Sequence, residues 1–321
     1  MIEQLKDDVR RLATPQGRMV GTRGHAEARA YLIRRIREIG LTPYADERFE
    51  YPYGGQAALV NVLARLEGTR PDAAPVLLAA HYDTCGAMPG ADDNASAIAI
   101  AFAVAERLRT HRPERPLIFA FFDGEEPPHF LTPTMGSTYF YENQRTGPVH
   151  CAVVLDLMGH AVPVPGLEDV LFVLGMESDP GLETVIRHTQ PRAGLRIAAV
   201  PNRVIGDMSD HHIFRINRRP YLFFSCGQWE HYHMPTDTPE KLDYEKMERM
   251  ATYLAGVVEK VSSTRLDGPF EGYDSSATEL ELMRKHADGI AKLLGLPLAD
   301  ARDMERLVHT MIARFGLLTE R

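Results

Sequence analysis

The sequence is poor in cysteine and tryptophan, with three Cys and one Trp among 321 residues. Three cysteines are too few for a disulfide framework in a chain of this length, which predicts a reducing compartment. No apolar run approaches the roughly 20 residues that cross a bilayer. The first stretch, MIEQLKDDVRRLA, lacks the apolar segment of a secretory signal. These absences predict a cytoplasmic protein without a membrane partner.

A basic stripe is also missing. The chain has 36 Lys+Arg and 44 Asp+Glu, a net charge of −8, without a long run of one sign. Nucleic-acid binders usually carry such a stripe, so we expect no nucleic-acid partner. Hydrophobic residues make up 44% and charged residues 25%, which is typical of an ordinary globular chain that buries a full core.

Short, wholly apolar runs alternate with helical patterns along the chain. The runs are 76–80, 117–122, 152–155, 170–174 and 221–224. Such runs are typical of strands buried on both faces. Helical patterns cover 25–39 and 95–108, and a further helix is expected from Thr238, as N-cap, with Pro239 in its first turn. The pattern predicts an α/β fold, a three-layer α/β/α sandwich around a mixed, mostly parallel sheet.

The C-terminal part follows a break at 268–276, GPFEGYDSS, and holds two amphipathic helical patterns at about 277–294 and 299–315. We therefore expect one domain over residues 1–265 and a helical hairpin extension over 266–321. One hairpin buries too little surface to be stable alone. Its apolar faces must pack on the first domain, as an added layer, or on a second copy in a homo-oligomer.

Carboxylates and histidines gather where the expected strands end. They are His81 and Asp83 in HYD, Asp92 and Asp93 in GADDN, Asp123, Glu125 and Glu126 in FFDGEE, Asp156 in VLD, and His231, His233 and Asp237 in EHYHMPTD. Singly, each has a structural explanation, such as an Asp that caps a helix. Ligand sites of α/β sheets form outside the carboxyl ends of the strands, and clustered acids repel one another unless cations neutralise them. The joint pattern therefore predicts a divalent metal site.

In this order and spacing, HYD, GADDNAS, FFDGEE, VLD, SDH and YHMPTDTPEKLD resemble the M28 family of co-catalytic zinc aminopeptidases. The upstream GRMVGTRGHAEARAYLIRRIREIGL and LVNVLARLEG resemble the same family. The likeness extends over about residues 10–262. It implies a di-zinc exopeptidase, an aminopeptidase that acts on peptide or aminoacyl substrates.

The resemblance also implies a role for each matching residue. One zinc ion would be bound by His81 and Asp156, the other by Glu126 and His233, and Asp93 would bridge them. Co or Mn also suits such ligands. Glu125 would be the general base, Asp83 would orient the His81 imidazole, and Tyr232 would donate a hydrogen bond to the oxyanion. A cis peptide bond is implied after Asp93.

A few positions depart from the family pattern. Cys85 lies near the metal motif, where we expect a small buried residue and not a ligand, because the ligand set is complete without it. Met208 precedes SDH, where some relatives carry a polar residue that reads the substrate. The segment PPHFLTPTM after Glu126 is long, and His129 or Phe130 in it either shapes specificity or belongs to a rigid surface loop.

Three alternative functions remain open. Glutaminyl cyclases share the resemblance but line their site with tryptophans, whereas this chain has Trp229 alone. A carboxypeptidase or another amidohydrolase could use the same metal pair, because loops set the preference for a terminus. A non-catalytic binding relative should have lost a ligand or the base, and all six of these positions are present.

Overall fold

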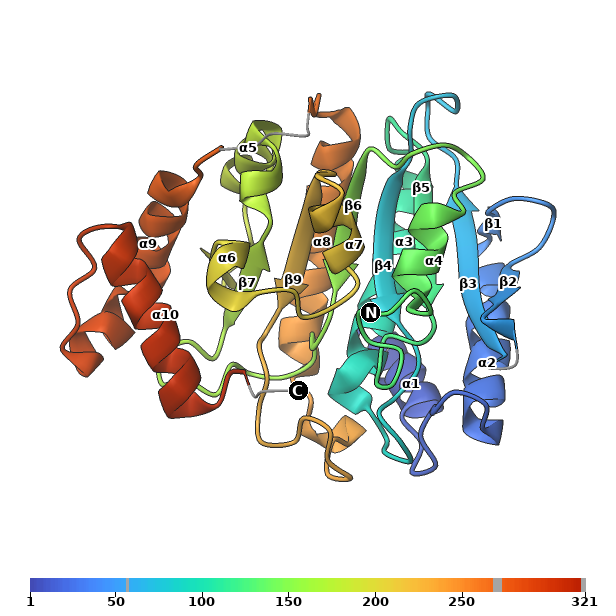
Figure 1. Cartoon of the computed structure of the whole chain (residues 1–321), viewed down its shortest axis with the longest axis horizontal. Helices are drawn as coiled ribbons and strands as arrows, with labels where there is room; N and C mark the ends of the chain where they lie inside the picture. The colour runs from blue at the N-terminus through green and yellow to red at the C-terminus, as the bar shows by residue number, and fades with distance from the viewer. Residues whose placement is uncertain (56–57, 268–272, 319–321) are drawn as a thin grey trace.

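The computed structural model describes residues 1–55, 58–267 and 273–318. Nine strands within these ranges form one sheet of order β1-β3-β5-β4-β6-β9-β7-β8, with β2 also paired to β3 (Figure 1). The strands are β1 (Thr42–Pro43), β2 (Glu50–Tyr53), β3 (Leu59–Leu66), β4 (Val76–His81), β5 (Leu117–Phe122), β6 (Cys151–Leu155), β7 (Val170–Leu174), β8 (Arg196–Ala199) and β9 (Tyr221–Ser225).

The middle of the sheet is parallel. Strand β4 pairs in parallel with β5 and β6, and β6 pairs in parallel with β9. Every residue of these strands is buried, which explains their unbroken apolar sequences. Strand β3 pairs antiparallel with β1, β2 and β5, and β7 pairs antiparallel with β9. The sheet is therefore mixed. The five apolar runs are all strands, as predicted.

Helices cover both faces of the sheet. On one face α1 (Ile2–Leu12), α2 (Arg23–Ile39), α3 (Ala97–Thr110) and α8 (Tyr244–Ser263) contact one another. On the other face lie α4 (Gly136–Glu142) and α7 (His212–Ile216), in front of the sheet in Figure 1. The shorter α5 (Pro180–His188) and α6 (Asn202–Ile205) follow β7 and β8. The predicted three-layer α/β/α architecture is confirmed.

The start of α8 was predicted wrongly. Pro239–Lys241 form a single 3-10 turn, and Leu242 is extended, with ψ 147°, so the chain leaves the helical path. The helix begins at Tyr244, where the Asp243 side chain accepts the Lys246 N–H at 2.9 Å as a true N-cap. The Thr-Pro signal therefore started a turn, and a second cap five residues later started the helix.

The C-terminal helices are α9 (Ser276–Leu294) and α10 (Ala301–Phe315), which lie at one margin of the molecule (Figure 1). Helix α9 packs on β8, and α10 packs on α9 and α6. The Arg196 guanidinium donates to the His286 carbonyl at 2.8 Å, and Arg203 pairs with Glu305 at 2.7 Å. These helices thus add a layer to their own chain, while the homo-oligomer stays a prediction. The predicted break at 268–276 falls partly on residues 268–272, outside the described residues.

Membrane insertion finds no support in the helices that the structure describes. In the ranges 1–55, 58–267 and 273–318, each helix is too short or too polar to cross a bilayer.

Candidate metal centre

Three neighbouring parallel strands bring ligand-type side chains to one edge of the sheet. His81 is the last residue of β4, Glu125 and Glu126 follow β5, and Asp156 follows β6 directly. Because the three strands run in parallel, their carboxyl ends meet there. Asp93 comes from the turn of Ala91–Ser96 that leads into α3.

His233 lies in the loop after β9. Its φ of 55° is left-handed, a conformation that costs a non-glycine residue roughly 1–2 kcal/mol. The Asp93–Asn94 peptide bond is cis.

The five side chains form two groups that share Asp93. On one side, Nε2 of His81 lies 3.1 Å from Asp93 Oδ1 and 3.6 Å from Asp156 Oδ1. On the other side, Nε2 of His233 lies 3.1 Å from Asp93 Oδ2 and 3.1 Å from Glu126 Oε2. Each oxygen of one carboxylate therefore faces a different imidazole.

The donor set fits zinc. Imidazole nitrogens and carboxylate oxygens are ordinary zinc ligands, and each group offers three of them with room for a further ligand. Among the buried atoms without a hydrogen bond in the described residues are four at the centre: His81 Nε2, Asp93 Oδ2, Glu126 Oε2 and Asp156 Oδ1. Buried polar atoms without a partner are costly, so a cation between them would explain the arrangement.

The electrostatics also favour a cation. Burial and the neighbouring Asp93 raise the pKa of Glu126 to about 7. Burial alone would lower the pKa of His233, but Asp93 and Glu126 raise it to about 10. Burial would likewise raise the pKa of Asp93, yet the imidazoles of His233 and His81 hold it well below its usual range. The centre thus has an excess of buried negative charge that a divalent ion would neutralise.

Asp83 and Asp237 hold the metal-binding loops in place. Asp83 accepts the backbone N–H groups of Glu125 and Glu126 at 3.2 and 3.0 Å, and its Oδ1 lies 3.5 Å from Nδ1 of His81. This contact with the second imidazole nitrogen is the expected orienting arrangement. Asp237 accepts the N–H groups of Asp92 and Asp93 at 2.9 and 3.1 Å.

Arg18 is a positioning residue of the site that the sequence did not single out. Its side chain is fully buried and donates to the carbonyl oxygens of Tyr82 at 2.7 Å, Pro89 at 2.7 Å and Gly90 at 3.0 Å. It thereby fixes the loop between His81 and Asp93 from behind. Its only sequence signal was its place in a segment that resembles the family.

Glu125 and Tyr232 lie beside the two groups. Glu125 is fully buried, with Oε2 3.9 Å from Nε2 of His81. The Tyr232 ring stacks on the His233 imidazole, with centroids 3.8 Å apart. Both predicted catalytic side chains therefore accompany ligand-type residues, Glu125 beside His81 and Tyr232 beside His233.

Several residues of the same motifs have structural roles instead. Asp92 binds the ring of His160 at 2.7 Å, and Asp123 binds the ring of His25 at 2.9 Å and the Val60 N–H at 2.7 Å. The His211 ring of SDH stacks on Phe223 at 4.3 Å. These contacts join the strand-end loops to one another, and sequence spacing alone could not separate them from ligands.

Cys85 differs from its prediction as a buried residue. It is half-buried, and its Sγ lies within 4.8 Å of one donor atom each of Glu126 and His233. Cys85 belongs to the loop after β4, which lines a small cavity together with Asp93, Glu126 and His233. His129 instead bonds to Thr134 at 2.9 Å within its own loop.

The comparisons with known proteins agree with this geometry. Residues 61–258 match the model of peptidase family M28, more than half of the chain. The chain belongs to peptidase family M28. Family membership places it among zinc-dependent metallopeptidases.

Individual relatives of this M28 chain are distant. It is 25% identical over 202 residues to the uncharacterized protein YfbL of Escherichia coli (strain K12), a match that covers 54% of this chain and 62% of YfbL. The chain thus spans less than two thirds of that relative, and smaller shares of the other curated relatives compared.

Solved structures with a similar fold include two kinds of enzyme. The glutaminyl cyclase of Fimbriiglobus ruber has a TM-score of 0.62 at 19% identity, covering 81% of this chain and 95% of that one. A leucine aminopeptidase precursor from Bacteroides thetaiotaomicron has a TM-score of 0.62 at 17% identity, covering 81% and 97%. Because both scores are equal, the fold alone does not separate peptidase from cyclase.

Proposed function

We propose that this M28 chain is a di-zinc aminopeptidase that removes N-terminal residues from peptides. One observation carries the proposal: the two oxygens of Asp93 face Nε2 of His81 and Nε2 of His233, each at 3.1 Å. A carboxylate placed between two imidazoles is what a pair of ions with one shared ligand requires. A mononuclear site would need only one of these faces.

The proposed ligands are those implied by the resemblance. His81 and Asp156 would hold one zinc ion, Glu126 and His233 would hold the other, and Asp93 would be shared. Zinc bound there would polarise the scissile carbonyl and make water acidic enough to lose a proton near neutral pH.

Glu125 is the proposed general base. Its carboxylate is fully buried and close to His81, and Asp83 fixes its backbone N–H at 3.2 Å. A fixed carboxylate in this position can take the proton of the attacking water on Oε2 and deliver it to the leaving amine. We propose that the Tyr232 hydroxyl donates to the oxygen of the tetrahedral intermediate, since its ring is held against His233.

The charge of the centre favours the amino terminus of a substrate. The centre collects Asp83, Asp93, Glu125, Glu126 and Asp156, all buried, around two imidazoles. With two zinc ions bound, the five carboxylates (−5) and the ions (+4) still leave about one net negative charge, so a substrate with a positive α-ammonium group is favoured over one with a C-terminal carboxylate. This supports an aminopeptidase over a carboxypeptidase on the same metal pair.

Glutaminyl cyclase is the second candidate, because structures of both kinds share this fold. The environment of Trp229 argues against it. The indole stacks on the buried His160 at 4.5 Å and meets the ring of His231 edge-on at 4.6 Å. The one tryptophan of the chain is thus packed between histidines and is not among the residues that line the small cavity beside Asp93.

A substrate panel tests the proposal. Zinc-loaded protein should hydrolyse unblocked aminoacyl-anilides and leave N-acetylated ones intact. Glutaminyl peptides should be cleaved without forming pyroglutamate, as mass spectrometry would show. Pyroglutamate formation without hydrolysis, or equal cleavage of blocked substrates, would overturn the aminopeptidase assignment.

A further inference from the structure

An apolar cavity of about 70 Å³ opens beside Asp156. On a scale of roughly 10–15 Å³ for one water-sized group, it has room for about one aliphatic side chain. Its lining near the sheet comes from Phe172 and Leu174 of β7 and from Phe223 of β9. Met208, the apolar residue where some relatives carry a polar one, also lines it.

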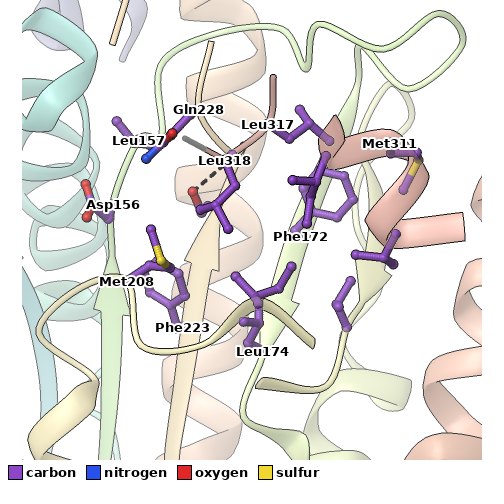
Figure 2. A pocket seen from close by; sticks show the side chains of 16 residues that line it. Asp156, Leu157, Phe172, Leu174, Met208, Phe223, Gln228, Met311, Leu317 and Leu318 are labelled. Atoms are coloured by element: carbon purple, nitrogen blue, oxygen red, sulfur yellow. Dashed lines mark hydrogen bonds between the residues drawn. The ribbon is translucent and has the colours of Figure 1, made fainter. Parts of the chain in front are cut away.

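The far wall of this cavity belongs to the C-terminal extension. Val308, Met311 and Ile312 of α10 line it, together with Leu317. Figure 2 shows Asp156 at one side and Met311 at the other, with Phe172 and Leu174 between them. The extension lies outside residues 61–258, the part of the chain that matches the family model.

The wall is fixed to the catalytic layer. The backbone N–H of Gln228 donates to the Leu317 carbonyl at 2.8 Å, which ties the end of α10 to the loop that carries His233. Met311 is 1% exposed, and Val308 is 3% exposed. Both side chains are therefore held between the helix and the cavity, in a position to set its depth.

We propose that the C-terminal extension completes the subsite for the side chain of the substrate's N-terminal residue. The inference rests on the proposed function. Asp156 belongs to the centre that would hold the scissile carbonyl and also lines this apolar cavity, so the side chain of the N-terminal residue can enter the cavity from there. Its size and lining favour an unbranched or γ-branched aliphatic side chain, as in methionine or leucine, and Met311 limits the length.

Substitutions at Met311 test the wall. Met311→Ala should deepen the subsite and raise the kcat/KM ratio of phenylalanyl- to leucyl-anilide about 10-fold or more, the scale of one or two methylene groups in a pocket. Met311→Phe should fill it and lower the ratio of leucyl- to alanyl-anilide by a similar factor. Met304→Ala is the matched control, because Met304 is an equally buried methionine of α10 that does not line the cavity.

A binding measurement separates this inference from the proposed function. Calorimetry of the zinc-loaded protein should show tighter binding of L-leucine than of glycine, a preference lost in Met311→Phe and kept in Met304→Ala. If neither the wild type nor any variant shows turnover, the aminopeptidase assignment fails. The preference for binding L-leucine over glycine then tests the subsite by itself. Unchanged selectivity in an active Met311 variant, or equal binding of leucine and glycine, would overturn it.

Discussion

Nη2 of Arg18 lies 3.3 Å from the carbonyl oxygen of Asp93, so a guanidinium more than 70 positions away supports the residue at the centre of the site. Burial lowers the pKa of Arg18 to about 10, which keeps it charged at neutral pH. The surrounding carbonyl oxygens, including those of Pro89 and Gly90, depend on it for hydrogen bonds. The loop that presents Asp93 therefore has its anchor in the N-terminal segment.

Removal of this anchor should destabilise the site. We expect Arg18→Met to leave several buried carbonyl groups unsatisfied, at about 1–3 kcal/mol each, and to lower both Tm and zinc affinity. The exposed Arg23, which pairs with Glu27 on α2, gives the control Arg23→Met, for which no loss is expected. Thermal melts with and without zinc measure both effects. An Arg18→Met protein with unchanged Tm and zinc affinity would contradict the anchoring role.

The general base can be tested without removing a ligand. Glu125→Gln keeps the shape of the side chain but cannot accept a proton, so kcat should fall by at least ~10²-fold. Zinc content should stay at the wild-type level. Glu142→Gln, at an exposed position of α4, controls for the loss of a carboxylate. Wild-type kcat in Glu125→Gln would show that another group takes the proton.

The buried Glu279 predicts a pH-dependent stability of the extension. Burial first, and then Glu177, raise its pKa to about 7, with Asp274 acting the same way and Ser275 and Arg203 opposing. A carboxyl whose pKa is raised on folding stabilises the fold when protonated, and this contribution is lost as the pH rises from about 4.5 through 7. Glu279→Gln should prevent this loss of stability at high pH, because an amide does not ionise.

We therefore expect Glu279→Gln to raise Tm relative to wild type at pH 8 and to change it little at pH 5. In a chain of this size the rise is roughly 2–4 °C or less for each kcal/mol. Differential scanning calorimetry at the two pH values measures it. Glu281→Gln, at an exposed position on the same helix, should give no such pH-dependent gain. An equal change in Tm on Glu279→Gln at pH 5 and pH 8 would show that ionisation of the Glu279 carboxyl does not affect the stability.

Truncation tests the extension as a whole. Met283, Ala287 and Ile290 of α9 are at most 2% exposed, so removal of residues 274–321 uncovers apolar surface at β8. We expect a lower Tm and more light scattering, with the proposed metal ligands intact. If the helices also join two copies, the truncated chain should elute as a smaller species in size-exclusion chromatography. An equally stable and soluble truncated chain would mean that the extension is dispensable for the fold.

The parts of the fold that the sequence predicted are those with a local signal. The buried strands around Val76 and Leu117 are apolar throughout, and their ends carry the polar residues that converge in space. Parallel strands place such ends at one edge without further information. The resemblance then assigned a role to each residue, which composition and spacing alone could not do.

The remaining features depend on distant parts of the chain. The contacts of Arg18 with Pro89 and of Leu317 with Gln228 join segments that no local pattern connects. The start of α8 was misplaced because two capping signals, Thr238 and Asp243, lie within a few residues, and only the Asp243 side chain makes the capping hydrogen bond. The apolar cavity beside Asp156 forms between residues of α10 and residues of β7 and β9. The amphipathic pattern of α10 predicts an apolar face but not which residues lie opposite it.

The central claim is a pair of zinc ions that share Asp93, and anomalous scattering measures it most directly. Crystals of the zinc-loaded protein should give two peaks at the zinc absorption edge, one between His81 and Asp156 and one between Glu126 and His233. Crystals of Asp93→Ala, prepared alongside, should lose at least one of them. A single peak in the wild-type protein at saturating zinc, or two peaks away from these side chains, would contradict the account.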